Sequence, residues 1–577
     1  MENRPLLWLP GMNPRPNPEG GGPSLIVYDT IADAEPDLHD LPTALLTRIC
    51  ASNLTDTLAV ISNANARLLH DGMGDKELHQ RLEADLVFPE LLARLEPVRA
   101  KRTSQSSVIF TRRSLLLLAK IALGAQRSAP GGELDQREIG TCVLILNELL
   151  QPTVGQSDEL LIVDMMANWD LFMPADVPHV LARFRLIVRR LLTSTHPTVV
   201  RAREQLALGE LLFDGLPFDE FQGLLIGVFG IITNAVRKWE APVIRIEPPL
   251  PRFVGGEEAV RAFFSMRSHA LDSFSDWRVG GSWTAARVRE LLADAVFLHD
   301  LTAFRQKPFV AIDDRFLLPD YHLAFERLTF GSYWTIFDAL SGNQRLQFSG
   351  AWGLAFEAYV LSLFAASYPA SQVLANVLTP NIQFPSGEID GVLDFGDHVV
   401  AVEVKSTLLP VLVRAARDAN AFAAWVQDRL VGTEQERGGL RQLAGAAAAI
   451  RDGLLGAPRG VVYPVLVTDE LSFQSLGVNR YLDAVFRGLV ASDRGIRPLT
   501  VITTDELEKL LPCITDGLVT WRGVLDRRAA DRDGWMWVGQ ALVDELVALG
   551  RTDQVRRHDI LVQEYRDFLR VLKVDQP

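Results

Sequence analysis

Cysteine is scarce in this chain. Cys50, Cys142 and Cys513 are the only three cysteines among 577 residues, and they lie far apart in the sequence. Cysteines this few and this widely spaced exclude a disulfide framework and a cysteine-rich zinc site. A reducing compartment fits best, and we expect a cytoplasmic protein.

Several motifs of common enzyme classes are also missing. The ten histidines are scattered and form no HExxH motif, which argues against a zinc hydrolase. The chain has no GxxxxGK[ST] phosphate loop and no GxSxG nucleophile elbow. Hydrolysis of ATP and serine-nucleophile chemistry are therefore not expected.

Long hydrophobic runs are absent as well. The N-terminal stretch MENRPLLWLPGMNPRPNPEGGG has no basic start followed by an apolar run, so we do not expect a secretory signal. The longest apolar stretch, GLLIGVFGIITNAV at 223–236, is too short to cross a bilayer. It predicts a buried helix, and no membrane association is expected.

Positive charge is in deficit, since 58 Lys and Arg face 72 Asp and Glu, for a net charge of −14. Binding to phosphate groups depends on local patches rather than on net charge. Two basic clusters could form such patches or could simply be solvated helix faces. The first contains Arg94, Arg99, Lys101, Arg102, Arg112 and Arg113, and the second contains Arg183, Arg185, Arg189 and Arg190.

The length of the chain predicts several domains, and the patterning predicts a multidomain α plus α/β protein with a mixed central sheet. No fixed-period repeat supports a solenoid. A break rich in proline and glycine at 241–258 separates mainly helical patterns. We expect a flexible lead-in at 1–29, a large helical region at 30–240, a connection and second helical segment at 241–344, an α/β core at 345–511 and a helical C-terminal region at 512–577.

The stretch GEIDGVLDFGDHVVAVEVKS at 387–406 places charged side chains within a predicted hairpin. With Gly396 and Asp397 as a two-residue turn, Asp390 lies opposite Glu403, and Glu388 lies opposite Lys405. A longer turn would shift this pairing.

The second strand of this hairpin is apolar on both faces. Val399 and Ala401 share a face with Glu403 and Lys405, while the other face is formed by Val400, Val402 and Val404. Such a strand is typical of a buried, central position. An ordinary amphipathic hairpin with surface charges is the alternative, and it fits this pattern poorly.

Two opposed carboxylates repel one another unless a proton or a cation lies between them. Mg²⁺ is typically bound by one or two carboxylates, with water and phosphate oxygens as further ligands. A nearby lysine could stabilise charge that develops on a phosphate group. Asp390, Glu403 and Lys405 therefore predict a metal-dependent site for phosphodiester hydrolysis.

These residues resemble the PD-(D/E)XK, or restriction-endonuclease-like, nuclease superfamily over about 345–510. The motif would be Asp390 followed by Glu403-Val404-Lys405, and the upstream helix sequence GLAFEAYV supplies Glu357. Two positions depart from the family pattern: Ile389 stands where proline is common, and Gln442 is followed by Ala446 rather than by the tyrosine of the RecB-like branch. Glu357 could point into the site or lie in water at the edge of its apolar helix face.

The resemblance implies a restriction-endonuclease-like core and a nuclease that depends on Mg²⁺ or Mn²⁺. The metal ligands would be Asp390, Glu403, the Val404 carbonyl and Glu357, and Lys405 would assist catalysis. The resemblance favours an endonuclease and favours DNA over RNA as the substrate. A large helical region fused to such a core suggests a bacterial defence or restriction system, with a regulatory protein partner or a homo-oligomer. The alternatives are an inactive nucleic-acid-binding or scaffold protein that keeps the fold, and a helical interaction protein with an unrelated α/β module.

Overall fold

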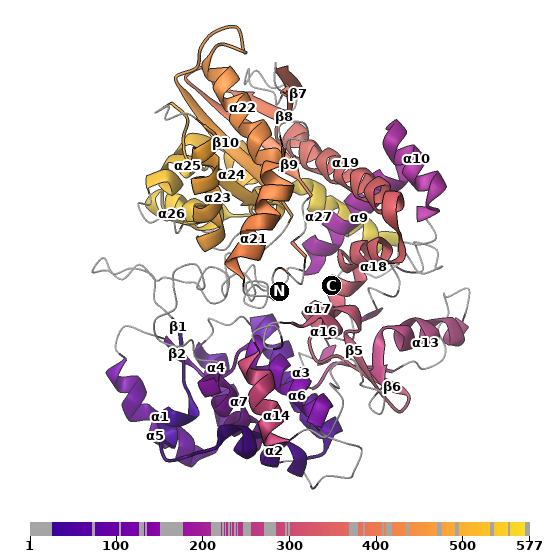
Figure 1. The fold of residues 1–577 in the computed structure, drawn as a ribbon, viewed down its shortest axis with the longest axis vertical. Coiled ribbons are helices and arrows are strands. Elements are labelled where there is room, and N and C mark those ends of the chain that lie inside the picture. The colour runs from indigo at the N-terminus through magenta and orange to yellow at the C-terminus, as the bar shows by residue number, and fades with distance from the viewer. Residues whose placement is uncertain are drawn as a thin grey trace.

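The structure is a computed structural model of the whole chain, and its described part combines many helices with three β-sheets (Figure 1). The described residues are 26–71, 76–102, 106–125, 132, 135–149, 177–208, 240–245, 256–270, 284–294, 300–368, 379–384, 387–406, 409–410, 418–433, 438–469, 476–490, 495–530, 536–551 and 554–571, with 297, 413 and single positions between 221 and 238.

The first helices pack around a core that also includes side chains from the segment 297–323, in the lower half of Figure 1. A short parallel strand pair, β1 (Ile26–Tyr28) with β2 (Ser106–Val108), lies beside them. The strand β1 falls inside the segment expected to be a flexible lead-in, of which 1–25 lie outside the described residues. The helices are α1 (Ile31–Ala34), α2 (Leu41–Ala51), α3 (Leu54–Asp71), α4 (Lys76–Leu86), α5 (Pro89–Lys101), α6 (Arg112–Ala125), α7 (Arg137–Leu149) and α14 (Ala285–Ala293).

A four-stranded sheet follows where the sequence predicts only a connection and helices. Its order is β3-β6-β5-β4, and each strand has only three or four residues. Strands this short show too few alternations for their period to be recognised in the sequence. The elements of this segment are β3 (Val243–Arg245), α13 (Gly256–Met266), β4 (Ser268–Ala270), α16 (Thr302–Gln306), β5 (Phe309–Ile312), β6 (Arg315–Leu317), α17 (Tyr321–Leu328) and α18 (Gly331–Ala339).

The α/β core predicted from the sequence contains a five-stranded sheet of order β11-β10-β9-β8-β7. Strands β7, β8 and β9 form an antiparallel meander, β10 pairs in parallel with β9, and β11 pairs in parallel with β10. The mixed sheet predicted from the sequence is thus confirmed, with β7 as a strand that was not predicted. The strands are β7 (Thr379–Phe384), β8 (Gly387–Asp394), β9 (His398–Lys405), β10 (Val461–Thr468) and β11 (Thr500–Thr503).

Helices cover both faces of this sheet because β9 and β10 are apolar on both faces. On one face, the side chains of Val400, Val402 and Val404 pack in a core with α19 (Gly342–Ser367). On the other face, Val399 and Ala401 pack in a core with three helices and an adjoining π-helical segment. These are α21 (Ala419–Val426), η1 (Gln427–Val431), α22 (Gly439–Arg451) and α23 (Leu476–Leu489).

The helices that follow β11 pack on the same face of the five-stranded sheet as α19. A helix from an earlier part of the chain packs with them. Helix α9 (Val177–Thr193) packs against both α19 and α27, and α10 (Pro197–Gln205) also contacts α19. The α/β core therefore incorporates part of the region that the sequence places in a separate helical domain. The C-terminal helices are α24 (Thr504–Thr515), α25 (Trp521–Ala530), α26 (Val538–Ala548) and α27 (Asp559–Val571).

Helix α19 is also the one element of the described chain that is long and apolar enough to cross a membrane by length and composition. Half of its apolar window is buried inside the protein, which is typical of a core helix. The stretch at 223–236 falls only partly within the described residues, where Leu224 and Val228 are buried.

Candidate active site

The β8–β9 hairpin has the register that a two-residue turn predicts. The backbone N–H of Phe395 donates to the carbonyl of His398 at 2.9 Å, so Gly396 and Asp397 form the turn. Gly396 has a φ of +84°, which a residue with a side chain rarely adopts. The ladder pairs Asp394 with Val399 and continues to Gly391 opposite Val402. Asp390 and Glu403 lie one step beyond this last pair.

Asp390 reaches the second strand through its side chain. Its Oδ2 atom accepts a hydrogen bond of 2.7 Å from the backbone N–H of Val404. This bond fixes one carboxylate oxygen of Asp390 at the peptide that joins Glu403 to Val404. The two acidic residues predicted to share a site are thus brought together at the end of the hairpin ladder.

Glu403 is fully buried, with none of its side chain exposed, and it contacts Lys405. The Lys405 Nζ atom lies 2.6 Å from Glu403 Oε1, at the distance of an ion pair. Lys405 is the one cation close to this carboxylate, and no other donor in the described part of the chain reaches either carboxylate oxygen. A buried carboxylate with a single partner is costly, because one partner replaces only part of the hydration that it loses.

The electrostatics of the site reflect this burial. Burial raises the pKa of Glu403 to about 8, although the positive charge of Lys405 opposes the shift. Burial also raises the pKa of Asp390, again against Lys405 and against the hydrogen bond from Val404. Burial alone would lower the pKa of Lys405, but Glu403 and Asp390 outweigh it, so the pKa of Lys405 lies above its ordinary value.

Glu357, on α19, belongs to the same electrostatic group. Burial raises the pKa of Glu357 to about 7, and the charges of Asp390 and Glu388 add to the shift while Lys405 opposes it. The side chain is partly buried rather than freely solvated. Glu388 contributes to the pKa of Asp390, whereas the ion pair of Lys405 in the described structure is with Glu403. The structure therefore brings Glu357 and Glu388 near the predicted site residues.

The start of α22 is a part of the site that the sequence did not reveal. Gly438 caps this helix, and Gly439 begins it. A Cβ atom built on Gly439 would lie 3.0 Å from Cγ and Cε of Lys405 and 3.3 Å from Cγ of Glu403. The backbone of α22 thus forms a wall against both side chains. The paired glycines at 438–439 were the only sequence signal for such a close approach.

The donor set suits a hard divalent cation such as Mg²⁺. Asp390 and Glu403 offer carboxylate oxygens, and among the described residues only Lys405 approaches the Glu403 oxygens. Within the described residues, no group of three or more His, Cys, Asp or Glu side chains is arranged to hold a metal ion. The fit therefore rests on two carboxylates, which is within the usual number for Mg²⁺ when water and phosphate complete its shell.

The two basic clusters are largely engaged within the protein. In the first, Arg99 and Arg102 both pair with the buried Asp29. Arg112 pairs with Asp320, and both of these side chains are almost fully buried. These arginines stabilise the helical region and are not a free phosphate-binding surface.

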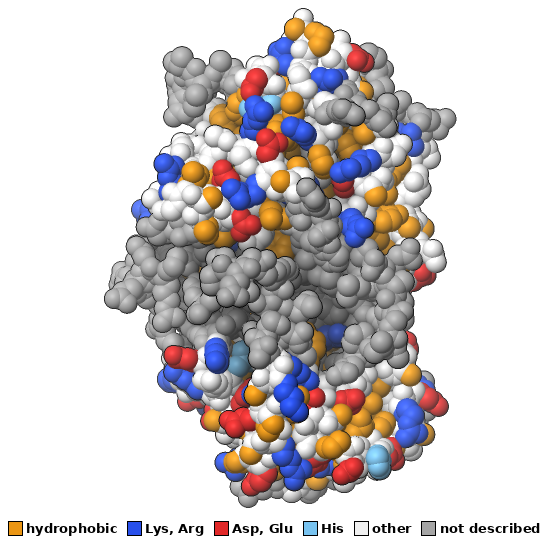
Figure 2. Space-filling view, turned by 90° about the vertical axis from the view of Figure 1, so that its left-hand side faces the viewer, with side chains coloured by type: hydrophobic (Ala, Val, Ile, Leu, Met, Phe, Trp, Pro, Cys, Tyr) orange, Lys and Arg blue, Asp and Glu red, His pale blue; other side chains and the backbone are white. Residues whose placement is uncertain are grey.

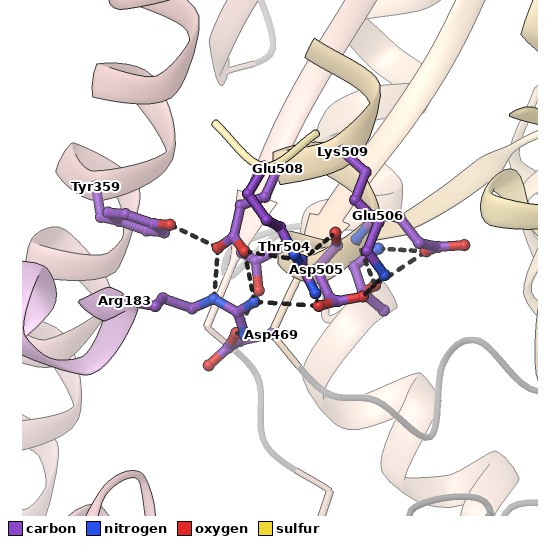
Figure 3. Close-up of polar contacts among 10 residues, drawn as sticks. Arg183, Tyr359, Asp469, Thr504, Asp505, Glu506, Glu508 and Lys509 are labelled. Atoms are coloured by element: carbon purple, nitrogen blue, oxygen red, sulfur yellow. Dashed lines mark hydrogen bonds and ion pairs between the residues drawn. The ribbon is translucent and has the colours of Figure 1, made fainter. Parts of the chain in front are cut away.

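The second cluster, on α9, contacts the C-terminal helices. Arg185 and Arg189 pair with Glu564 at 2.8 and 2.7 Å. Arg183 forms two hydrogen bonds with Glu508, of 2.5 and 2.8 Å, inside a buried network (Figure 3). The expectation that these clusters are either solvated faces or phosphate patches is therefore corrected for the paired arginines. On the face drawn in Figure 2, Lys and Arg are interspersed with Asp and Glu over the described surface.

Comparisons of this chain with protein-family models, with curated proteins and with solved structures found no match.

Proposed function

We propose that this protein is a divalent-metal-dependent nuclease and that its active site lies at the end of the β8–β9 hairpin. The observation that carries the proposal is the fully buried Glu403 carboxylate, whose one close partner among the described residues is Lys405 and which lies near Asp390. A buried carboxylate with a strongly raised pKa and so few partners is typical of a functional site.

Asp390 and Glu403 would hold the cation, with the Val404 carbonyl and Glu357 as further ligands by resemblance to PD-(D/E)XK nucleases. When bound, Mg²⁺ or Mn²⁺ supplies a Lewis acid that neutralises charge on a phosphodiester and activates water. The hydrogen bond from Val404 to Asp390 orients the first carboxylate. Lys405, held by Glu403, places a positive charge where charge develops on the phosphate group.

The substitution Asp390→Asn tests this proposal. The amide keeps the shape of the side chain but removes a charge that holds the cation. We expect cleavage of plasmid and oligonucleotide DNA in Mg²⁺ to fall at least about a hundredfold, because a metal contributes several kcal/mol of transition-state stabilisation and each 1.4 kcal/mol is about tenfold in rate. The melting temperature, Tm, in metal-free buffer should stay level or rise slightly.

The control measurements are the wild-type protein with EDTA, in which cleavage should stop, and a parallel RNA substrate, which tests the preference for DNA. Cleavage by the Asp390→Asn variant at the wild-type rate, with a normal Tm, would remove the hairpin from consideration as the active site.

The second candidate is a nucleic-acid-binding or scaffold protein that keeps this fold without catalysis. The observation that favours it is that the described residues hold no ready group of three metal ligands. This alternative predicts binding of nucleic acid that is unchanged by EDTA and is not followed by cleavage.

A further inference from the structure

A glycine, Gly439, lies against the side chains of Lys405 and Glu403 in the candidate site. Gly439 lies at the first position of α22, and the helix packs against β8, β9 and β10. The Cβ atom of an alanine at this position would lie 3.0 Å from two carbon atoms of Lys405 and 3.3 Å from Cγ of Glu403. These separations are shorter than ordinary carbon contacts of about 3.5–4.0 Å, so the neighbours would have to move by a few tenths of an ångström.

The conformation of Gly439 does not itself require glycine. Its φ is not among the positive values found for glycines of the described chain. The neighbouring Gly438 is different, because a Cβ there would lie 2.3 Å from the backbone carbonyl of Leu430. Gly438 is therefore explained by backbone packing, whereas Gly439 is explained by the space that Lys405 and Glu403 occupy.

The side chains beside Gly439 have different freedom to move. The Glu403 side chain is fully buried and cannot shift without displacing the core, while 30% of the Lys405 side chain is exposed. An added methyl group would therefore act mainly on Lys405, which rests on the glycine through both Cγ and Cε.

We propose that Gly439 is a positioning residue, whose missing side chain lets the α22 backbone set the place of the Lys405 ammonium group beside Glu403 and Asp390. This inference rests on the proposed function of the same site. It predicts that a single methyl group at 439 impairs catalysis without unfolding the protein.

The first test is the kinetics of Gly439→Ala. We expect kcat for DNA cleavage in Mg²⁺ to fall about tenfold, because small displacements of positioned groups cost one to two orders of magnitude. The KM should stay within about twofold, since no substrate-binding group is removed. A kcat equal to that of the wild type would overturn the inference.

Two other glycines provide matched controls. Gly350 in α19 and Gly488 in α23 are exposed helical glycines with nothing within 4 Å of an added Cβ. Gly350→Ala and Gly488→Ala should leave kcat unchanged and keep or raise Tm, since alanine favours a helix over glycine. A loss of kcat in these variants equal to that of Gly439→Ala would mean that any change of helical glycine has this effect, and would also overturn the inference.

The second test does not depend on activity. In the wild-type background, the contact of the added methyl group with Lys405 should make Gly439→Ala lower the Tm. The Lys405→Ala variant lacks the Cγ and Cε atoms, so adding Gly439→Ala to it should leave the Tm unchanged. If Gly439→Ala alone fails to fold, the double variant decides: a Tm at or above that of Lys405→Ala supports the contact, and an unfolded double variant overturns it. A wild-type protein that does not cleave would overturn the proposed function, whereas a cleaving wild type with an unaffected Gly439→Ala variant would overturn only this inference.

Discussion

At the scale of the residue, Glu403 differs from a second buried glutamate in the number of its cationic partners. Another buried glutamate, Glu564, is paired with two arginines at 2.8 and 2.7 Å. Glu403 has one close cation, Lys405, at 2.6 Å. Charge at this position is therefore expected to destabilise the metal-free protein, whereas charge at Glu564 is expected to stabilise it.

This difference gives a prediction about stability. Glu403→Gln removes a poorly solvated charge, so its Tm in EDTA should equal or exceed that of the wild type. Addition of Mg²⁺ should raise the Tm of the wild type, by an amount that corresponds to about 2.7 kcal/mol when the ion is at 100 times its Kd, but not that of the variant. Thermal unfolding in the two buffers measures both effects.

Glu564→Gln is the matched control, because it also replaces a buried carboxylate by an amide. It should lower Tm in both buffers, since two arginines lose a charged partner. If Glu403→Gln also lowers the Tm in both buffers, and Mg²⁺ does not change the Tm of the wild type, Glu403 is only the structural partner of Lys405.

At the scale of elements, the most informative contact joins α9 to the sheet-containing region. Arg183 of α9 donates to Glu508 of α24, and Tyr359 of α19 donates to the same carboxylate at 2.6 Å (Figure 3). Asp469, just after β10, and Asp505 lie 3.4 and 3.7 Å from the Arg183 guanidinium group. Three helices and one strand end therefore meet at one buried arginine.

The substitution Arg183→Met should destabilise the protein by about 3–5 kcal/mol at neutral pH, because it leaves Glu508 buried with less compensation. Arg189→Met is the control: half of that side chain is exposed, and Arg185 would still pair with Glu564, so its cost should be below about 1 kcal/mol. Denaturant unfolding measures both. An equal effect of the two substitutions would contradict the central role of Arg183.

The pH dependence of this effect follows from Asp505. Burial alone would raise the pKa of Asp505, but the charges of Arg557, Lys509 and Arg183 outweigh it and hold the pKa well below its ordinary value. Because the pKa of Asp505 in the folded protein lies below its ordinary value of about 4, the ionised carboxylate stabilises the folded protein at pH values above about 4. This stabilisation is lost as the pH falls from about 4 through the lower pKa of the folded state. The difference in the free energy of unfolding between the wild type and Arg183→Met should therefore become smaller as the pH falls below about 4.

At the scale of the whole molecule, the packing of α9 changes where the chain can be divided. The sequence places the boundary of the α/β core near 345, yet its largest core includes Phe184, Ile187 and Leu191 of α9. A fragment that begins at 345 would lose these side chains and Arg183 together. Its exposed apolar surface would face water on both α19 and α27.

A fragment of 345–577 is therefore expected to be insoluble or loosely packed, whereas co-expression with 177–208 should restore a cooperative unfolding transition. Soluble yield and thermal unfolding of the two preparations measure this. The matched control is co-expression with a copy of 177–208 that carries Arg183→Met, which should restore less. A fragment of 345–577 that unfolds cooperatively by itself would show that α9 is dispensable.

The sequence alone determined the local features of the site. Alternating valines specify β9, the Gly396-Asp397 turn fixes the register, and that register predicts Asp390 beside Glu403. These features depend on residues within about twenty positions of one another in the sequence, so the short-range periodicity of the sequence predicts them.

Only the tertiary structure decided the environment of these residues. Two contacts join segments far apart in the chain, the approach of Gly439 to Lys405 and the pairing of Arg183 with Glu508. The burial of Glu403 likewise depends on the helices that cover the sheet. No periodicity in the sequence encodes such contacts, because they depend on how helices and strands pack after they form. For this reason the arginines of α9 had the pattern of a solvated face in the sequence, while in the folded protein Arg183 and Arg185 are buried against the C-terminal helices.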